Sequence, residues 1–268
     1  MNNFKDLEIA VAGTQNTLTD YHYLETSYIN ENILTYNNHI GQHEFSVLLG
    51  HSIQATRWDK NESSKQGFPT ENIYEMDGGS QNDHVTGSAE ETALQSFFGR
   101  VNYNYGGRYL LEVNVRHDGS SRMPKKNRYA TFPSFSGAWL ISNEAFMQDV
   151  KLLSSLKLRA SWGKLGNQEI GNYAYMETLA ASGNYYFGDT KYVGMRRSKI
   201  ANENIKWETT TMTDVGFDAS FWQGKISVVF DWYEKNTSDI LLQLPMPNIF
   251  LGSLSAPYQN AGKVRNRG

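Results

Sequence analysis

The chain has 268 residues, of which 39% are hydrophobic and 13% aromatic, and its formal net charge is −3. It contains no cysteine, which excludes disulfide bonds and cysteine-ligated zinc, and no run of Lys or Arg that would attract nucleic acid. No apolar stretch reaches the roughly 20 residues that a membrane-spanning helix requires. The 16 Tyr, 23 Gly and only 6 Pro favour strands joined by tight turns.

Strict alternation of apolar and polar side chains is the clearest pattern in the chain. In residues 108–117, Tyr109, Leu111 and Val113 fall on one face of a strand, and Glu112 and Asn114 fall on the other. A tilted strand that crosses a bilayer has this length of about ten residues, with one face toward hydrocarbon and one toward water. Eight such strands are predicted, at residues 21–37, 43–57, 93–105, 108–117, 131–142, 155–163, 206–220 and 224–237.

The predicted connections alternate between short and long. Short ones lie at residues 38–42, 106–107, 143–154 and 221–223, and long ones lie at 58–92, 118–130 and 164–205. Gly106 and Gly107 suit a two-residue hairpin, because its central residues need positive φ. A small hairpin is expected near residues 173–178. Outer-membrane barrels have short periplasmic turns and long extracellular loops, so the pattern predicts an all-β, antiparallel, up-and-down transmembrane barrel segment.

Aromatic residues at the strand ends predict two interfacial girdles. The short-turn girdle would contain Tyr105, Tyr109, Phe221 and Trp222, and the opposite girdle would contain Trp162, Trp207 and Trp232. A soluble sandwich with one packed face is the alternative explanation of the alternation. The dense charge on the polar faces and loops of up to roughly 40 residues favour the barrel instead.

Several stretches carry a resemblance to a known family. They are RYLLEVNVRHDGSSR (108–122), FPSFSGAWLISNEAFM (132–147), LKLRASWGKLGNQEIGNYAY (156–175), KWETTTMTDVGFD (206–218), DWYEKNTSDILLQLPMP (231–247) and NAGKVRNRG (260–268). Together they resemble the barrel of TonB-dependent transporters of the SusC/RagA family of Bacteroidota. Met123 and Ala138 depart from it, since Phe and Gly are expected at those positions.

The resemblance implies a larger architecture than this chain provides. Family barrels have about 22 strands and a plugged lumen, and about eight strands cannot close such a barrel. Residues 1–268 are therefore expected to be a partial barrel domain, with the signal peptide, the plug domain and the remaining strands outside it. The implied function is import of oligosaccharides or peptides across the outer membrane, without enzymatic activity or a cofactor. The implied partners are TonB and a SusD-like surface lipoprotein.

Candidate functional residues follow from the predicted faces and loops. Six polar residues are expected to face the lumen and line a hydrated passage: Glu112, Asn114, Arg116, Asp214, Asp218 and Asp231. Four aromatic residues in outer loops are candidates for stacking on sugar rings, or for packing within the loops: Trp58, Tyr185, Tyr186 and Phe187. Five cations near one outer loop are candidates for binding lipopolysaccharide phosphate, or for solvating the loop: Arg116, Arg122, Lys125, Lys126 and Arg128.

Other chemistry has little support in the sequence. The six His residues lack metal-ligand spacing, and the oxygen-rich segment 77–83 lacks the spacing of an EF-hand calcium loop. No nucleophile elbow, phosphate-binding loop or dinucleotide-binding motif occurs. Two alternatives stay open: a siderophore or vitamin receptor with the same barrel, and a soluble β-rich adhesin or carbohydrate-binding module.

Overall fold

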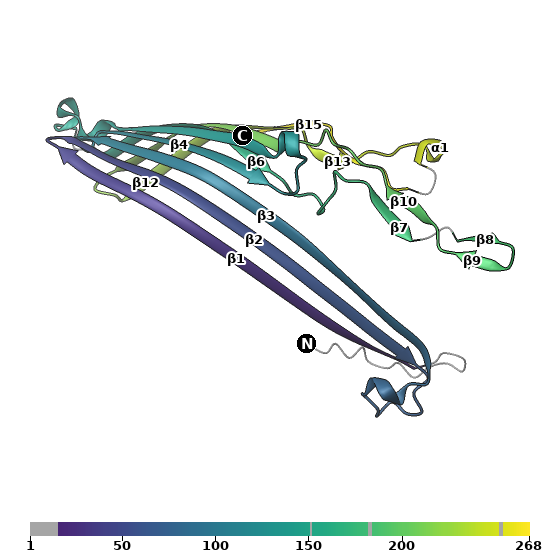
Figure 1. The fold of residues 1–268 in the computed structure, drawn as a ribbon. Helices are drawn as coiled ribbons and strands as arrows, with labels where there is room; N and C mark the ends of the chain where they lie inside the picture. The colour runs from purple at the N-terminus through teal and green to yellow at the C-terminus, as the bar shows by residue number, and fades with distance from the viewer. Residues whose placement is uncertain (1–15, 151, 182–183, 252–253) are drawn as a thin grey trace. The chain divides into compact units, whose positions relative to one another are not determined.

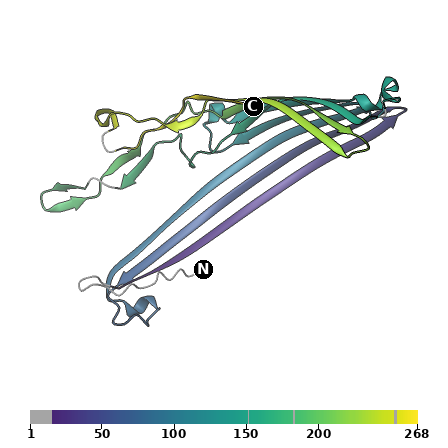
Figure 2. The same ribbon diagram turned by 180° about the vertical axis from the view of Figure 1, so that it is seen from behind.

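The computed structural model describes residues 16–150, 152–181, 184–251 and 254–268. Within these residues the chain forms two compact units, one of residues 16–29 and 54–92 and one of residues 30–53 and 93–268. None of the described helices is long and apolar enough to cross a membrane. Strands dominate both units (Figures 1 and 2).

Nine strands form the main sheet, in the order β1-β2-β3-β4-β5-β6-β11-β12-β15. They are β1 (Thr17–Ile40), β2 (His43–Gln66), β3 (Gln81–Tyr105), β4 (Tyr109–Ser120), β5 (Tyr129–Leu140), β6 (Leu153–Asn167), β11 (Glu208–Phe221), β12 (Ile226–Ser238) and β15 (Lys263–Arg267). Each strand pairs with the next main-sheet strand along the chain, which is an up-and-down topology. The predicted all-β antiparallel architecture is confirmed.

Short elements occupy the connections. The two-stranded pairs are β7 (Thr178–Ala181) with β10 (Met195–Lys199), β8 (Tyr185–Phe187) with β9 (Thr190–Tyr192), and β13 (Leu241–Gln243) with β14 (Tyr258–Asn260). The helical turns are η1 (Met76–Gly78), η2 (Lys125–Asn127), η3 (Ile141–Asn143), η4 (Ala145–Met147) and α1 (Asn248–Leu251). The hairpin predicted near residues 173–178 is wrong, because the paired segments begin only at Thr178.

All eight predicted strands are present, but the long connection predicted at residues 58–92 is wrong. Strand β2 continues to Gln66 and β3 begins at Gln81, so only residues 67–80 connect them. The added segments have no apolar face, which is why alternation could not reveal them. Cross-strand polar contacts join them instead, including Asn82 Nδ2 donating to Gln66 Oε1 at 2.6 Å and an Arg57–Glu91 ion pair at 2.5 Å.

The predicted Gly-Gly turn joins β3 and β4, but the loop has three residues, Gly106, Gly107 and Arg108, instead of the predicted two, because Tyr105 pairs with Tyr109. Gly106 has φ of 56° and Gly107 has φ of 63°, and the amide of Arg108 donates to the carbonyl of Tyr105 at 3.0 Å. Positive φ at both central residues gives a turn whose twist matches that of the flanking strands. This turn sets the register in which Val101 lies opposite Val113.

The strands of the second unit separate an apolar face from a polar face. Leu111 and Phe230 are both 54% exposed, and Val113 and Trp232 are also exposed, so no second protein layer among the described residues covers them. This contradicts the soluble alternative, in which these side chains would be packed in a core. An apolar face of this kind is what a strand presents to hydrocarbon.

On the apolar face, the apolar residues end at a different height on each strand, so the boundary between them and the polar residues toward the long loops runs obliquely across the sheet. One hydrogen-bonded row joins Val101, Val113, Phe135, Trp162, Thr213 and Glu234. Toward the long-loop end, the apolar residues of β3 extend four positions beyond this row, to Phe97, whereas those of β12 stop two positions short of it, at Trp232. The shift is about 20 Å along the strands over about 24 Å across them, at usual strand spacings. The resulting slope of about 40° equals the strand tilt of transmembrane barrels.

Candidate functional site

The six predicted lumen residues lie on one face of the sheet. Glu112, Asn114 and Arg116 alternate along β4, and Asp214 and Asp218 lie on β11. A single row across the sheet connects Glu112 through Ser136 and Ser161 to Asp214. Asp231 of β12 lies opposite Gly216, which is on the same face of β11 as Asp214 and Asp218. All six side chains therefore lie on the face opposite Leu111 and Val113.

Arg159 of β6 is the centre of an ionic cluster on this polar face. Its guanidinium lies 2.5 Å from Asp231 Oδ1, 3.2 Å from Asp218 Oδ1 and 3.6 Å from Asp214 Oδ1. Three strands thus contribute to one cluster, which we call the Arg159 cluster. One guanidinium cannot neutralise three carboxylates, so the cluster has an excess of two negative charges. The side chains are partly exposed, so water screens these charges.

Gly216 makes the Arg159 cluster possible. Arg159 and Asp231 are on β6 and β12, and Gly216 lies between them on β11 in the same row. A Cβ atom at Gly216 would lie 2.4 Å from Asp231 Oδ1 and 3.1 Å from Arg159 Cζ. The absent side chain therefore leaves the space in which the two charged groups meet.

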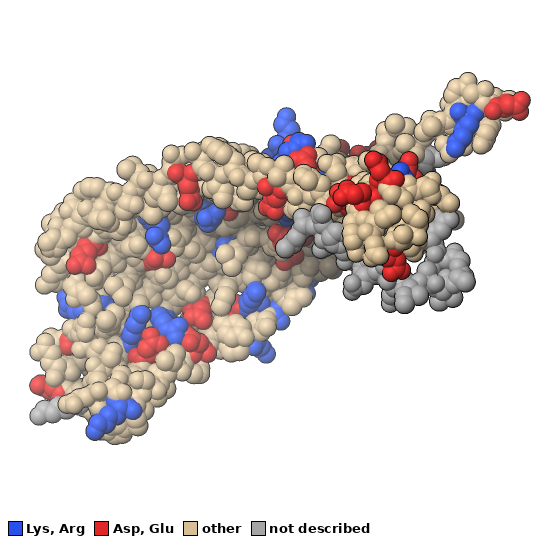
Figure 3. Space-filling view, turned by 90° about the horizontal axis from the view of Figure 1, so that it is seen from below, with Lys and Arg blue, Asp and Glu red and all other residues tan. Residues whose placement is uncertain are grey.

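Arg116 has its own partners on β3 and β4. Its Nη2 atom donates to Asp118 Oδ1 at 3.1 Å and to Ser96 Oγ at 3.2 Å, and its guanidinium lies 5.3 Å from the centre of the Phe98 ring. Asn114 donates to Glu112 at 2.7 Å. These contacts hold the charged groups in place along β4. Figure 3, seen from below, shows basic and acidic side chains intermixed over much of the surface.

A cavity of about 1040 Å³ opens on the polar face of the second unit. Its lining includes Asn104, Glu112, Ser136, Arg159 and Asp214, which come from β3, β4, β5, β6 and β11. Because its wall is rich in charged and amide groups, the cavity suits a hydrated polar solute. Among the described residues, no three His, Cys, Asp or Glu side chains converge to hold a metal ion.

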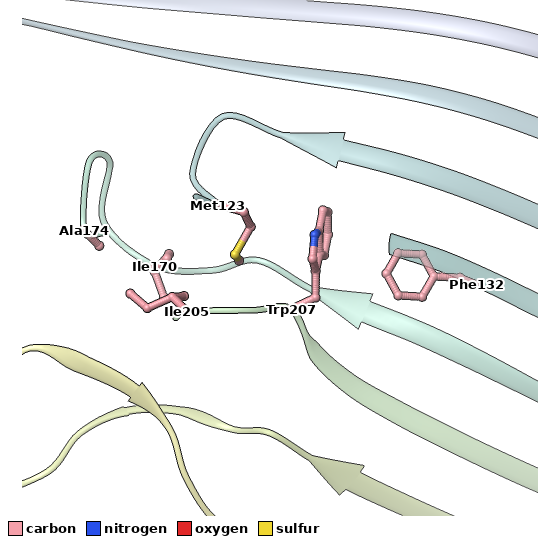
Figure 4. Packing of buried hydrophobic residues seen from close by; sticks show 6 residues of the cluster. All are labelled: Met123, Phe132, Ile170, Ala174, Ile205 and Trp207. Atoms are coloured by element: carbon pink, nitrogen blue, oxygen red, sulfur yellow. The ribbon is translucent and has the colours of Figure 1, made fainter. Parts of the chain in front are cut away.

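Buried packing in the second unit is concentrated at the long-loop end. Met123, Phe132, Ile170, Ala174, Ile205 and Trp207 form the loop cluster shown in Figure 4. Met123 and Ile205 are fully buried, and Trp207 packs edge-on against Phe132 at 5.5 Å. The prediction that Trp207 belongs to an exposed girdle is wrong, because loop residues cover its ring.

Hydrogen bonds tie the three loops of this cluster together. Asn127 Nδ2 donates to the carbonyl of Ile205 at 2.9 Å, and Trp207 Nε1 donates to the carbonyl of Arg128 at 3.1 Å. Arg122 forms an ion pair with Glu169 at 3.2 Å. The loops around residues 121–128, 168–177 and 200–207 therefore form one packed platform.

The five cations expected to gather near one outer loop do not form a single free cluster. Arg116 is paired with Asp118, Arg122 with Glu169, and Lys126 Nζ donates to Asn204 Oδ1 at 2.5 Å. Arg116 therefore stabilises the polar face, and Arg122 and Lys126 stabilise the loop platform. The sequence placed them near the loop correctly but could not show their partners.

The aromatic candidates are split between two places. Trp58 is not in a loop: it lies within β2 and is partly buried. Tyr185, Tyr186 and Phe187 form β8, and Tyr186 and Phe187 are 66% and 70% exposed. The Tyr185 ring stacks on Tyr192 of β9 at 5.7 Å. The hairpin of β8 and β9, here called the aromatic hairpin, projects beyond the β7–β10 pair in Figures 1 and 2.

A carboxylate secures the short-turn end of the sheet. Glu144, between η3 and η4, accepts hydrogen bonds from Trp139 Nε1 at 2.9 Å and from Arg108 Nη1 at 3.1 Å. Hydrogen bonds from Tyr109, Trp139 and Arg108 hold the pKa of Glu144 below its usual value. The rings of Tyr105, Tyr109 and Trp139 follow one another at 6.2 Å spacings, as expected for the short-turn girdle.

Comparisons with known proteins agree with this arrangement. Residues 2–268 match the family model described as TonB dependent receptor-like, beta-barrel. The chain is 35% identical to TonB-dependent receptor P3 of Formosa agariphila over 97% of its own length and 26% of that protein. It is 36% identical to TonB-dependent receptor SusC of Bacteroides thetaiotaomicron over 87% of its own length and 23% of that protein.

Solved structures give the same result for the fold. The structure of the RagAB peptide transporter matches with a TM-score of 0.85 and 30% identity, over 94% of this chain and 28% of the other. The chain therefore spans about a quarter of the length of the relatives that it matches.

Proposed function

Because the chain belongs to the TonB-dependent receptor β-barrel family, we propose that it is part of an outer-membrane importer of oligosaccharides or peptides. The family is one of outer-membrane transporters and not of enzymes. The observation that carries the proposal is a sheet with one bare apolar face and one charged face, matched along nearly the whole chain to SusC and RagA. The rest of the barrel, the plug and the TonB contact belong to the whole protein.

We assign the polar face to the lumen. Glu112, Asn114 and Arg116 line it on β4, and the Arg159 cluster adds Asp214, Asp218 and Asp231. The ion pairs of this face attract water, and water screens the excess negative charge of the Arg159 cluster, so the face binds a passing solute only weakly. A passage of this kind favours transient contact with polar cargo over tight binding.

The partner proposed for the extracellular side is a SusD-like surface lipoprotein. Support comes from the likeness to RagAB, a peptide transporter. The loop platform is a packed group of loops, and the aromatic hairpin presents exposed aromatic side chains. Tyr186 and Phe187 of the aromatic hairpin are the residues proposed to contact the lipoprotein or to stack on cargo.

Uptake by whole cells tests the proposed function. A strain lacking the gene would be supplied with labelled oligopeptides, labelled oligosaccharides and ferric siderophores, with and without a protonophore. We expect loss of energy-dependent uptake of peptides or oligosaccharides, restored by the intact gene. Unchanged uptake of both classes with loss of siderophore uptake would support the alternative siderophore receptor and contradict the proposal.

A further inference from the structure

Strand β15 presents three cations on the apolar side of the sheet. Lys263, Arg265 and Arg267 alternate along the strand and lie opposite Ser238, Asn236 and Glu234 of β12. Those β12 residues share the face of Trp232 and Phe230, because they are separated from them by even numbers of positions. The three cations therefore point to the same side as the apolar band, away from the Arg159 cluster.

The cations lie just beyond the apolar limit. Trp232 is the last apolar residue on this face of β12, and Glu234 lies two residues farther toward the long loops. Arg267 lies directly opposite Glu234. Because the boundary of the apolar residues runs obliquely, it lies about one residue farther toward the short-turn end on β15 than on β12. Arg267 then lies in the layer of about 5–8 Å that holds lipid headgroups, and Arg265, two residues farther out at about 10 Å, reaches this layer with its long side chain.

The local charge is positive. Glu234 is the carboxylate of β12 in these rows, and it forms an ion pair with Arg265. Among the described residues, three cations against one carboxylate leave two positive charges on an exposed surface. Glu234 also orients Arg265, and a positioned guanidinium offers two parallel N–H groups to a phosphate.

We propose that Arg265 and Arg267, with Lys263 beyond them, bind the phosphate of a phosphorylated lipid in the outer leaflet. The lipid chains would lie against the apolar face below, along Trp232, Phe230 and Val228. Charge complementarity and the position at the apolar limit together favour a lipid headgroup over a protein partner. This site is separate from the passage, so it is independent of the cargo.

Lipid binding by the whole barrel protein tests the site. The protein would be placed in phosphatidylcholine nanodiscs and titrated with bisphosphorylated lipid A or with the same lipid after dephosphorylation, and bound lipid would be counted by native mass spectrometry. R265Q/R267Q should bind the phosphorylated lipid about 25-fold more weakly, at about fivefold per cation. R265K/R267K keeps both charges but lacks the paired N–H donors, so its affinity should lie between those of R265Q/R267Q and the unchanged protein.

The matched control is R196Q/R197Q, which removes the same charge from two adjacent exposed arginines of β10. It should bind lipid as the unchanged protein does. Equal binding by R265Q/R267Q, an equal loss in the control, or equal binding of the dephosphorylated lipid would each overturn the proposal. Folding would be checked by the heat-dependent gel mobility of the barrel, and the single variant R267Q would replace the double if the double failed to fold.

Discussion

Arg159 and Asp231 meet across an intervening strand, with 2.5 Å between Nη1 and Oδ1, over the bare backbone of Gly216. The two residues are 72 positions apart, and neither strand alone shows the contact. It connects β6, β11 and β12 on the polar face.

Substituting Gly216 by alanine should separate the charged pair. The new Cβ would lie 2.4 Å from Asp231 Oδ1 and 2.5 Å from the carbonyl oxygen of Phe230. We expect a loss of about 1–3 kcal/mol of unfolding free energy, the usual cost of overpacking, measured by urea titration of the barrel in lipid. G171A is the control, because nothing lies within 4 Å of its new Cβ. Equal stability of G216A and the unchanged protein would refute the role of Gly216.

Substituting Arg159 by glutamine should leave Asp214, Asp218 and Asp231 without their shared cation. We expect a lower free energy of unfolding, because the three carboxylates would repel one another without the guanidinium, and the loss should be small because water screens these partly exposed charges. The added negative charge should also increase the cation preference of ion conductance through the barrel in planar bilayers. R159K should retain the selectivity. An unchanged selectivity in R159Q would show that the cluster does not face the passage.

The β3–β4 turn depends on positive φ at both central residues. Gly107 has φ of 63°, so G107A should destabilise the barrel by about 1–2 kcal/mol. G106N should be tolerated, because Asn adopts this conformation in such turns. The fraction of folded protein by heat-dependent gel mobility would measure both. Equal effects of the two substitutions would contradict the turn geometry.

Glu144 should make the short-turn end sensitive to acid. Its folded pKa lies below the unfolded value, so its stabilising contribution is present above about pH 4.5 and is lost as pH falls through the folded pKa. E144Q should remove that part of the pH dependence. Thermal unfolding from pH 3 to pH 7 would measure it, and parallel curves for the two proteins would rule the contribution out.

The sequence predicted the membrane part of the fold well and the extramembrane part poorly, for one physical reason. Alternation arises where one strand face meets hydrocarbon, as at Leu111 and Val113. Beyond that zone both faces are wet, so β3 from Gln81 to Thr92 carried no signal. The faces of Asp214 and Asp231 followed from alternation, but their joint contact with Arg159 required the register across three strands. No local pattern encodes that register.

The orientation of the two faces is the central claim, and single cysteines on β4 test it most directly. This chain has no native cysteine, so within it each label would report one position. Spin labels at Leu111 and Val113 should be relaxed by membrane-dissolved oxygen, and labels at Glu112 and Asn114 by a water-soluble nickel chelate. Alternating accessibility along the four positions is the predicted result. Equal accessibility to both reagents, or protection of Leu111 and Val113 from oxygen, would contradict the assignment of the apolar face to lipid.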